Sequence, residues 1–377
     1  MCKSILIIIG SICVFTGLAQ VDNKITISVI NKSSIPFKQH VISIPWTDIV
    51  TKYPSIDTAF FTVINGATKK EIPFQLEYGG QPGIQNLLIQ TDVAGNSSVK
   101  IFLQNGKPSP AKPKTYCRYV PERKDDFAWE NDKIAFRMYG SALEGTKENA
   151  FGIDVWVKRT DRLILNERYK KADYHVDHGD GLDYYHVGLS LGAGNIAPYI
   201  NDSIWYSKNY RLWKVLDNGP LRSTFQLDFD EWGVAGRKVK MTKTVSLDAG
   251  SQLSRIEVSY SYSNNDSLPV VVGIIKRKEP GTVMLDEQNS IMGYWEPKHG
   301  KDGTTGTGTI LLNPVLKMKV NNEHLLSLST AVRNQSFVYY TGAAWDKAGV
   351  IKNARDWFLY LQTFQQQLQQ PLLVRLF

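Results

Sequence analysis

The chain has 377 residues, 42% of them hydrophobic, so it can bury one large core or two ordinary ones, and it is not a disordered tail. Its formal net charge is +8, but the basic residues are scattered along the chain. This dispersion argues against a nucleic-acid partner and favours a local site for an anionic ligand.

The first 19 residues have the pattern of a secretory signal peptide. A basic start precedes an apolar run, Ile5 to Phe15, and small residues precede Gln20. A membrane span needs roughly 20 apolar residues, so this run is too short, and we predict no membrane partner. We therefore expect an exported protein, either periplasmic or secreted.

The cysteines fit the same picture. Cleavage near Gln20 removes Cys2 and Cys13 and leaves Cys117 as the one thiol, so no intrachain disulfide can form. Lipid attachment at Cys13 is the alternative, although Ile12 stands where a small residue is expected. Without disulfides, stability must come from a packed core.

Short apolar or alternating segments rich in Val, Ile, Thr, Phe and Tyr recur along the chain and predict β-strands. The predicted strands are 24–30, 39–46, 58–64, 86–93, 99–104, 133–139, 152–159, 223–230, 238–247, 254–263, 269–276, 308–312 and 336–342. Only the segment 352–370 has apolar residues at helical spacing, and Pro371 ends it.

Many short strands without intervening helices predict an all-β fold of stacked antiparallel sheets, a β-sandwich with one C-terminal helix. The segment 105–115, rich in Pro and Lys, predicts a linker. We therefore divide the chain into a signal peptide (1–19), an N-terminal β region (20–110) and a larger β-sandwich region (111–377).

The segment 173–188, DYHVDHGDGLDYYHVG, holds three of the six histidines, four aspartates and three tyrosines. Gly179 and Gly181 permit a tight turn, so we expect these polar groups at a loop rim. We expect His175 and Asp177 on one strand face, with His178 and Asp180 on the turn.

Three interpretations of this segment remain open. It is a solvated loop whose aspartates bond their own backbone, a divalent-cation site at Asp177 and Asp180, or a catalytic or sugar-contacting cluster. The spacing matches no defined zinc or EF-hand pattern, so the sequence predicts no cofactor apart from that cation.

Two further stretches carry groups that suit an acidic sugar. Lys276, Arg277 and Lys278 close an apolar strand, as a protective charged edge or as a clamp for a carboxylate or sulfate. Trp295, Glu296 and His299 precede a Gly/Thr-rich stretch, 300–309, which we interpret as a loop. Rings beside such a loop suit the C–H face and hydroxyls of a sugar.

Five stretches together resemble the exported bacterial and fungal family called domain of unknown function 4861. They are 123–140, 173–194, 216–227, 276–304 and 339–349, and the resemblance extends from about Thr26 onward. It implies that residues 111–377 form a galactose-mutarotase-like β-supersandwich catalytic domain and that the substrate is among acidic plant or algal polysaccharides. His186 departs from the pattern, where a lysine is more usual, and so weakens an anion-binding role there.

For a uronic-acid substrate we expect β-elimination, by a lyase or a terminal-uronide dehydratase. The site must neutralise the carboxylate, take the C5 proton and assist the leaving oxygen. We assign the carboxylate to His175 or His178 with Arg277, and proton transfer to Tyr184 or Tyr185. The expected substrate-binding residues are Trp129, Asn131, Arg137, Lys276, Lys278, Trp295, Glu296, His299 and Trp345.

Three alternatives use the same groups. Glycoside hydrolysis needs two carboxyl groups roughly 5 to 9.5 Å apart, and Glu296, Asp177 and Asp180 are the candidates. Epimerisation or mutarotation would use similar acids and bases. A non-catalytic glycan-binding protein would use the aromatic rings and cations without turnover.

Overall fold

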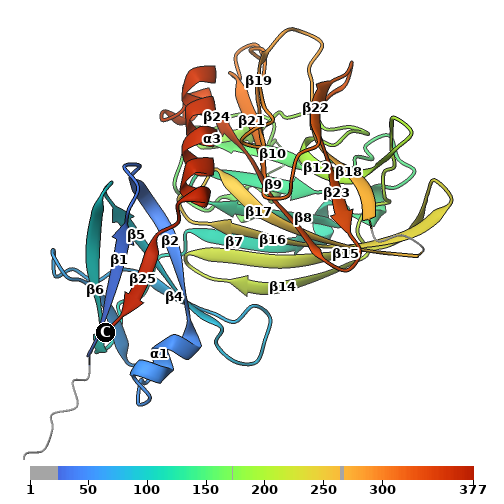
Figure 1. Cartoon of the computed structure of the whole chain (residues 1–377). Coiled ribbons are helices and arrows are strands. Elements are labelled where there is room, and N and C mark those ends of the chain that lie inside the picture. The colour runs from blue at the N-terminus through green and yellow to red at the C-terminus, as the bar shows by residue number, and fades with distance from the viewer. Residues whose placement is uncertain (1–23, 172, 264–266) are drawn as a thin grey trace, which may run out of the picture.

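The computed structural model describes residues 24–171, 173–263 and 267–377. The predicted signal peptide, with Cys2 and Cys13, lies outside the described residues. The fold is all-β and antiparallel, as predicted, with a smaller N-terminal region beside a larger sandwich (Figure 1). None of the described helices combines the length and apolar character needed to cross a membrane.

The smaller region consists of two sheets around one apolar core. Its first sheet has the order β25-β1-β6-β3 and its second the order β2-β5-β4. Helix α1 covers one end of it. The bounds are β1 (Lys24–Asn31), β2 (Phe37–Pro45), α1 (Trp46–Lys52), β3 (Phe61–Asn65), β4 (Phe74–Glu77), β5 (Asn86–Val93), β6 (Ser97–Asn105) and β25 (Leu373–Leu376).

The C-terminal strand returns to this region, which the predicted boundaries did not provide for. We had assigned residues 111–377 to the second domain, but β25 pairs with β1 along Ile27–Ile30. Val374 and Leu376 pack on the small core. The pairing covers an edge of β1 that would otherwise expose its backbone donors and acceptors. The predicted linker, 105–115, does separate β6 from β7.

The larger region has three sheets. The first has the order β11-β10-β9-β8-β7, the second β13-β12-β18-β23-β22, and the third β14-β15-β16-β17-β24-β21-β20-β19. Bounds in the first sheet are β7 (Thr115–Val120), β8 (Asp126–Asn131), β9 (Ile134–Met138), β10 (Asp154–Lys158) and β11 (Gly181–Asp183). The second sheet contains β12 (Ala193–Ile200), β13 (Ser203–Ile204), β18 (Ser267–Ile275), β22 (Lys317–Val320) and β23 (His324–Val332).

The third sheet is the largest and forms one wall of the main core. Its strands are β14 (Leu212–Asn218), β15 (Arg222–Val234), β16 (Arg237–Asp248), β17 (Leu253–Tyr262), β19 (Thr282–Asp286), β20 (Ile291–Trp295), β21 (Thr305–Leu311) and β24 (Ser336–Trp345). Buried and partly exposed residues alternate along β16, so one face packs inward. The main core joins side chains from all three sheets.

Helix α3 (Ala354–Gln369) packs on the outer face of this third sheet (Figure 1). It begins after Asn353, whose side chain accepts a hydrogen bond from the Asp356 amide, and it ends before Pro371, as the sequence predicts. Glycines of β21 allow the close approach, because a Cβ at Gly308 would lie 2.6 Å from Leu361. Residues 305–307 belong to β21, whereas the sequence predicts a loop there; the predicted strand 308–312 corresponds to the rest of β21.

The remaining elements are short. They are α2 (Leu165–Tyr169) and three 3₁₀ turns, η1 (Pro121–Arg123), η2 (Ser141–Leu143) and η3 (Asp346–Ala348). Helix α2 belongs to the connection between β10 and β11, which covers the outer face of the first sheet, where Leu165 packs with Trp156. The histidine-rich segment lies at the end of this connection.

Candidate functional site

The histidine-rich segment is a loop that leads into β11, not the strand face that we expected. Its backbone has φ angles of 101° at Gly179 and 120° at Gly181, which favour glycine. The Asp177 Oδ1 atom accepts hydrogen bonds from both glycine amides, at 2.9 and 3.1 Å. Asp177 therefore stabilises the turn, as aspartates often do.

Asp177 and Asp180, which the sequence suggests as ligands of a divalent cation, each pair with an arginine. Asp177 Oδ2 lies 2.8 Å from Arg159, and Asp180 pairs with the buried Arg168. Burial opposes ionisation of Asp177, but its hydrogen bonds with backbone amides and the charge of Arg159 outweigh burial and lower its pKa. In the described ranges, no three His, Cys, Asp or Glu side chains are grouped so that they could hold a metal ion.

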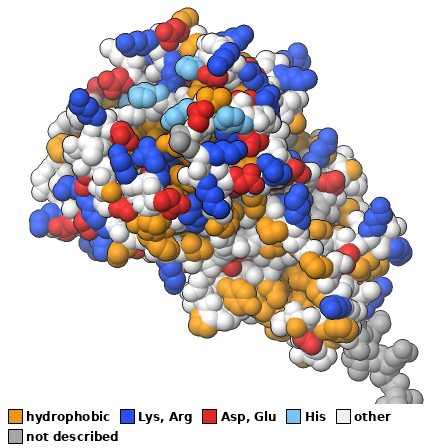
Figure 2. All heavy atoms as spheres, turned by 180° about the vertical axis from the view of Figure 1, so that it is seen from behind, with side chains coloured by type: hydrophobic (Ala, Val, Ile, Leu, Met, Phe, Trp, Pro, Cys, Tyr) orange, Lys and Arg blue, Asp and Glu red, His pale blue; other side chains and the backbone are white. Residues whose placement is uncertain are grey.

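The histidines of this segment are exposed. His175 Nδ1 lies 2.7 Å from the Asp183 carbonyl oxygen, and His178 Nε2 lies 3.3 Å from that of Asp173. His186 is exposed too. Figure 2 shows histidine side chains gathered on one face of the molecule, among side chains of both charges.

Beneath the histidines, an arginine and a glutamate from distant strands meet a tyrosine. Arg277 follows β18, and its Nε atom donates to Oε1 of Glu296, which follows β20, at 2.8 Å. Its Nη1 atom donates to the His186 carbonyl oxygen at 2.7 Å. The guanidinium carbon lies 4.5 Å from the centre of the Tyr185 ring. The structure thus brings together two predicted catalytic residues and one predicted substrate-binding residue.

The acidity of Glu296 is strongly changed by its surroundings. Its side chain is 5% exposed, and burial raises its pKa to about 7 against the lowering effect of Arg277. The Arg277 side chain remains 18% exposed, and its pKa is raised because burial is outweighed by Glu296 and Tyr185. A carboxyl group with such a pKa can both give and accept a proton near neutral pH.

The two neighbouring tyrosines differ in access. The Tyr185 hydroxyl is buried and makes no hydrogen bond within the described residues, and burial raises its pKa well above the ordinary value. The half-buried Tyr184 hydroxyl lies 2.6 Å from Thr305 Oγ1, and burial raises its pKa as well. Both phenols stay neutral, so Tyr184 can donate a proton but is a poor base.

His299 completes the cluster from the loop between β20 and β21. Its ring stacks on that of Tyr184, with centroids 5.2 Å apart, and its Nδ1 atom lies 3.3 Å from Asp302 Oδ2. The Asp302 carbonyl oxygen accepts a hydrogen bond from Trp345 Nε1 at 2.8 Å. Trp345 is 1% exposed, so it holds this loop in place from the protein interior.

Three other residues predicted to bind substrate are buried in the first sheet. Trp129 donates to Ser254 Oγ within the main core. The Asn131 side chain holds the turn between β8 and β9 to the Asp248 carbonyl oxygen. Arg137 is surrounded by three buried carboxylates. None of the three has a surface that a substrate could reach in this fold.

The remaining three residues predicted to bind substrate are Lys276, Lys278 and Trp295, and their side chains lie apart from the cluster or make contacts elsewhere. Lys276 Nζ donates to the Asn321 carbonyl oxygen, and Lys278 is exposed. Trp295 faces helix α3, where it packs over Gly306. Its side chain points away from Glu296 because successive residues of an extended chain alternate between faces.

Sequence reasoning missed three members of the cluster. Asp302 stands three residues after His299, a spacing that could have suggested the pair. Thr305 was not selected because the sequence around it was interpreted as a loop. Asp346 follows Trp345 directly, and its buried Oδ1 atom has no hydrogen-bond partner in the described part of the chain. Asp302, Asp346 and Glu296 all act on the pKa of Tyr184.

These features define the class: an all-β sandwich protein with a cluster of titratable side chains around one partly exposed guanidinium. The chain belongs to the family described as "Domain of unknown function (DUF4861)", whose model matches residues 29–374. It is 29% identical to "Uncharacterized protein P7" of Formosa agariphila over 389 residues, covering 97% of this chain and 96% of that protein.

Two solved structures from Enterococcus faecalis have a similar fold. One is a protein in the glycosyl hydrolase family 38, with a TM-score of 0.55 and 10% identity, covering 94% of this chain. The other is an α-mannosidase, with a TM-score of 0.50 and 10% identity over the same share. The chain spans about half the length of each, 48% and 46%. At this identity the likeness concerns the fold alone.

Proposed function

We propose that this is an exported enzyme that acts on uronic-acid-containing oligosaccharides or polysaccharides by β-elimination. The observation that carries the proposal is the pairing of Glu296 with a partly exposed Arg277 beside Tyr184 and His299. These groups meet the three demands of the reaction, which are charge neutralisation, a base and an acid.

Arg277 is the group proposed to bind the substrate carboxylate. Its Nε and Nη1 atoms are held by Glu296 and by a backbone carbonyl oxygen, so the guanidinium is fixed before substrate arrives. A planar, permanently charged guanidinium suits a carboxylate. Neutralising that carboxylate lets negative charge develop on it when the neighbouring C5 proton leaves.

His299 and Tyr184 are the groups proposed to move protons. Asp302 faces one ring nitrogen of His299, which leaves Nε2 to take the C5 proton. Tyr184 is neutral and gives its proton to the leaving oxygen on C4. The C5–H and C4–O bonds break and a C4–C5 double bond forms. If the leaving group is a terminal hydroxyl, the second product is water.

Relative to the sequence-based hypothesis, the roles shift. Tyr185 is sealed beneath Arg277, so we keep only Tyr184 as a proton donor. His175 and His178 lie on the exposed loop and remain candidates for contacts with the sugar chain. Glu296 holds Arg277 and can exchange protons with the cluster near neutral pH.

The test uses a panel of uronate-containing oligosaccharides. We expect new ultraviolet absorbance from an unsaturated uronide, with mass spectrometry showing either chain cleavage or loss of one water. The variants Arg277→Lys and His299→Ala should lower kcat/KM by about 10²- to 10⁴-fold. His186→Ala is the matched control, because Arg277 uses only the backbone of this exposed histidine. Turnover by His299→Ala at the wild-type rate would refute the assignment of the base.

Glycoside hydrolysis is the second candidate. It is favoured by the three carboxyl groups that influence the pKa of Tyr184, namely Glu296, Asp346 and Asp302. A protonated and an ionised carboxyl group together can perform acid and base roles at a glycosidic bond. The same assay separates the two reactions, since hydrolysis produces reducing ends without new absorbance.

A further inference from the structure

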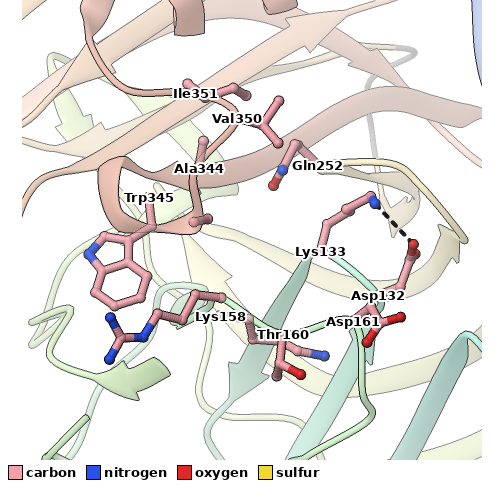
Figure 3. Close-up of a pocket in the computed structure, with 12 residues that line it drawn as sticks. Asp132, Lys133, Lys158, Thr160, Asp161, Gln252, Ala344, Trp345, Val350 and Ile351 are labelled. Atoms are coloured by element: carbon pink, nitrogen blue, oxygen red, sulfur yellow. Dashed lines mark ion pairs between the residues drawn. The ribbon is translucent and has the colours of Figure 1, made fainter. Parts of the chain in front are cut away.

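A cavity of about 180 Å³ opens beside Trp345 (Figure 3). It lies between the turn after β8, the end of β10, Gln252 before β17 and the chain that follows β24. Trp345 also donates to the Asp302 carbonyl oxygen, so the cavity and the proposed catalytic cluster share this indole.

The walls of the cavity differ in chemistry. One wall is apolar and contains Trp345, Val350 and Ile351. Lys133 and Arg159 also line the cavity, with side chains that are 32% and 39% exposed, and the Arg159 guanidinium lies beside the Trp345 ring. Each lining cation already has a carboxylate partner: Lys133 pairs with Asp132, the buried Lys158 with Glu130, and Arg159 with Asp177. Lys133 and Arg159 stay partly exposed, so they can also contact an anionic ligand. A pyranose residue has the matching pattern, since its C–H face is apolar and its edge is polar.

One atom of the lining lacks a partner. Gln252 Oε1 is buried and accepts no hydrogen bond within the described residues. Figure 3 shows the Gln252 amide pointing toward the space between Trp345 and Lys133. A buried acceptor without a donor destabilises the protein, so a ligand hydroxyl that donated to it would offset that loss.

The cavity is linked to the histidine-rich loop as well as to Trp345. Arg159 pairs with Asp177 of that loop at 2.8 Å, and its guanidinium carbon lies 6.0 Å from the centre of the Trp345 ring. A sugar chain whose reacting residue lay at His299 would therefore have its next residue near this cavity. Arg159 is placed to contact both the loop and that residue.

We propose that this cavity is a second sugar subsite, which binds the neighbouring anionic residue of the oligosaccharide through Gln252, Lys133 and Arg159. The inference rests on the proposed function, because the same oligosaccharide would have to occupy both the catalytic cluster and this cavity on the other side of Trp345. It predicts that substrates long enough to fill both subsites bind more tightly than a substrate that fills only the catalytic one.

The test measures binding by titration calorimetry, with a uronate monosaccharide and a uronate-containing tetrasaccharide. The His299→Ala background slows turnover, so affinity is measured apart from chemistry. In this background, Gln252→Leu and Arg159→Ala should each bind the tetrasaccharide about tenfold more weakly, as expected for a loss of about 1.4 kcal/mol. Their affinity for the monosaccharide should not change. Arg162→Ala is the matched control, because this exposed arginine lies outside the lining.

The outcomes separate the two proposals. Wild-type affinity for the tetrasaccharide in both variants, or equal losses for both ligands, would overturn the subsite while elimination by the parent enzyme stood. Absence of binding and of product with every uronate would overturn both proposals. A melting curve for each variant shows that it is folded, and two variants from different elements guard against a local distortion in one of them.

Discussion

The replacement Glu296→Gln tests the central electrostatic feature of the site without any substrate. Gln keeps the shape of the side chain and can still accept from Arg277 Nε, but it cannot ionise. The wild-type carboxyl group has a pKa of about 7 in the folded protein, against 4.5 for an ordinary glutamate. Any pH dependence that this carboxyl group gives to stability must therefore disappear in the variant.

Proton linkage gives the sign and the size of this pH dependence of stability. Because the folded pKa lies above the unfolded one, the native state binds more protons between these values, and stability falls as pH rises. The stabilising contribution is complete below about pH 4.5 and is lost as pH passes through about 7. A gap of about 2.5 pKa units corresponds to about 3 kcal/mol, since one unit is about 1.4 kcal/mol.

The assay is urea unfolding of both proteins at pH values from 4 to 8.5. The free energy of unfolding of wild type minus that of Glu296→Gln should fall by about 3 kcal/mol between the two ends. Glu279→Gln, at an exposed position near the same site, is the control and should give a constant difference. A constant difference for Glu296→Gln as well would refute the argument that burial governs this carboxyl group.

Two further predictions concern stability. Arg137→Met leaves the buried carboxylates of Asp126, Asp154 and Asp183 without their cation. It should cost about 3–5 kcal/mol in urea unfolding at pH 8 and less at pH 5, where protons can replace the cation; equal losses at both pH values would contradict this. Trp357→Ala removes a fully buried ring that packs helix α3 on β21 and should cost about 3–5 kcal/mol, whereas Leu359→Ala, exposed on the same helix, should cost little.

Local sequence patterns were sufficient for most of the secondary structure. Alternating apolar residues predicted strands such as β16 and β17, and helical spacing before Pro371 predicted α3. The prediction was wrong for residues 305–307, where glycine and threonine suggested a loop but the chain forms the start of β21. In the structure, the Gly308 side of β21 lies against α3 and Thr307 is buried on the other face. The glycines of β21 let α3 pack closely against the sheet, and the sequence alone does not show that this helix lies there.

The candidate site was partly predictable. Residue chemistry selected Tyr184, Arg277 and His299, and the structure places them around Glu296. The same reasoning selected Trp129 and Arg137, which are buried in the core. The same aromatic or cationic residue type can lie in a buried core or line a cleft. The sequence therefore could not distinguish the two locations.

The sequence by itself determined the all-β class, the antiparallel arrangement and the final helix, because each depends on the periodicity of a few neighbouring residues. Tertiary structure alone decided that the last strand returns to β1, that Asp177 and Asp180 pair with arginines, and that Glu296 is buried beside Arg277. Burial and charge proximity are set by contacts between residues far apart in the chain. The raised pKa of Glu296 therefore depends on the tertiary packing that buries it where β18 and β20 end, and the sequence alone could not predict it.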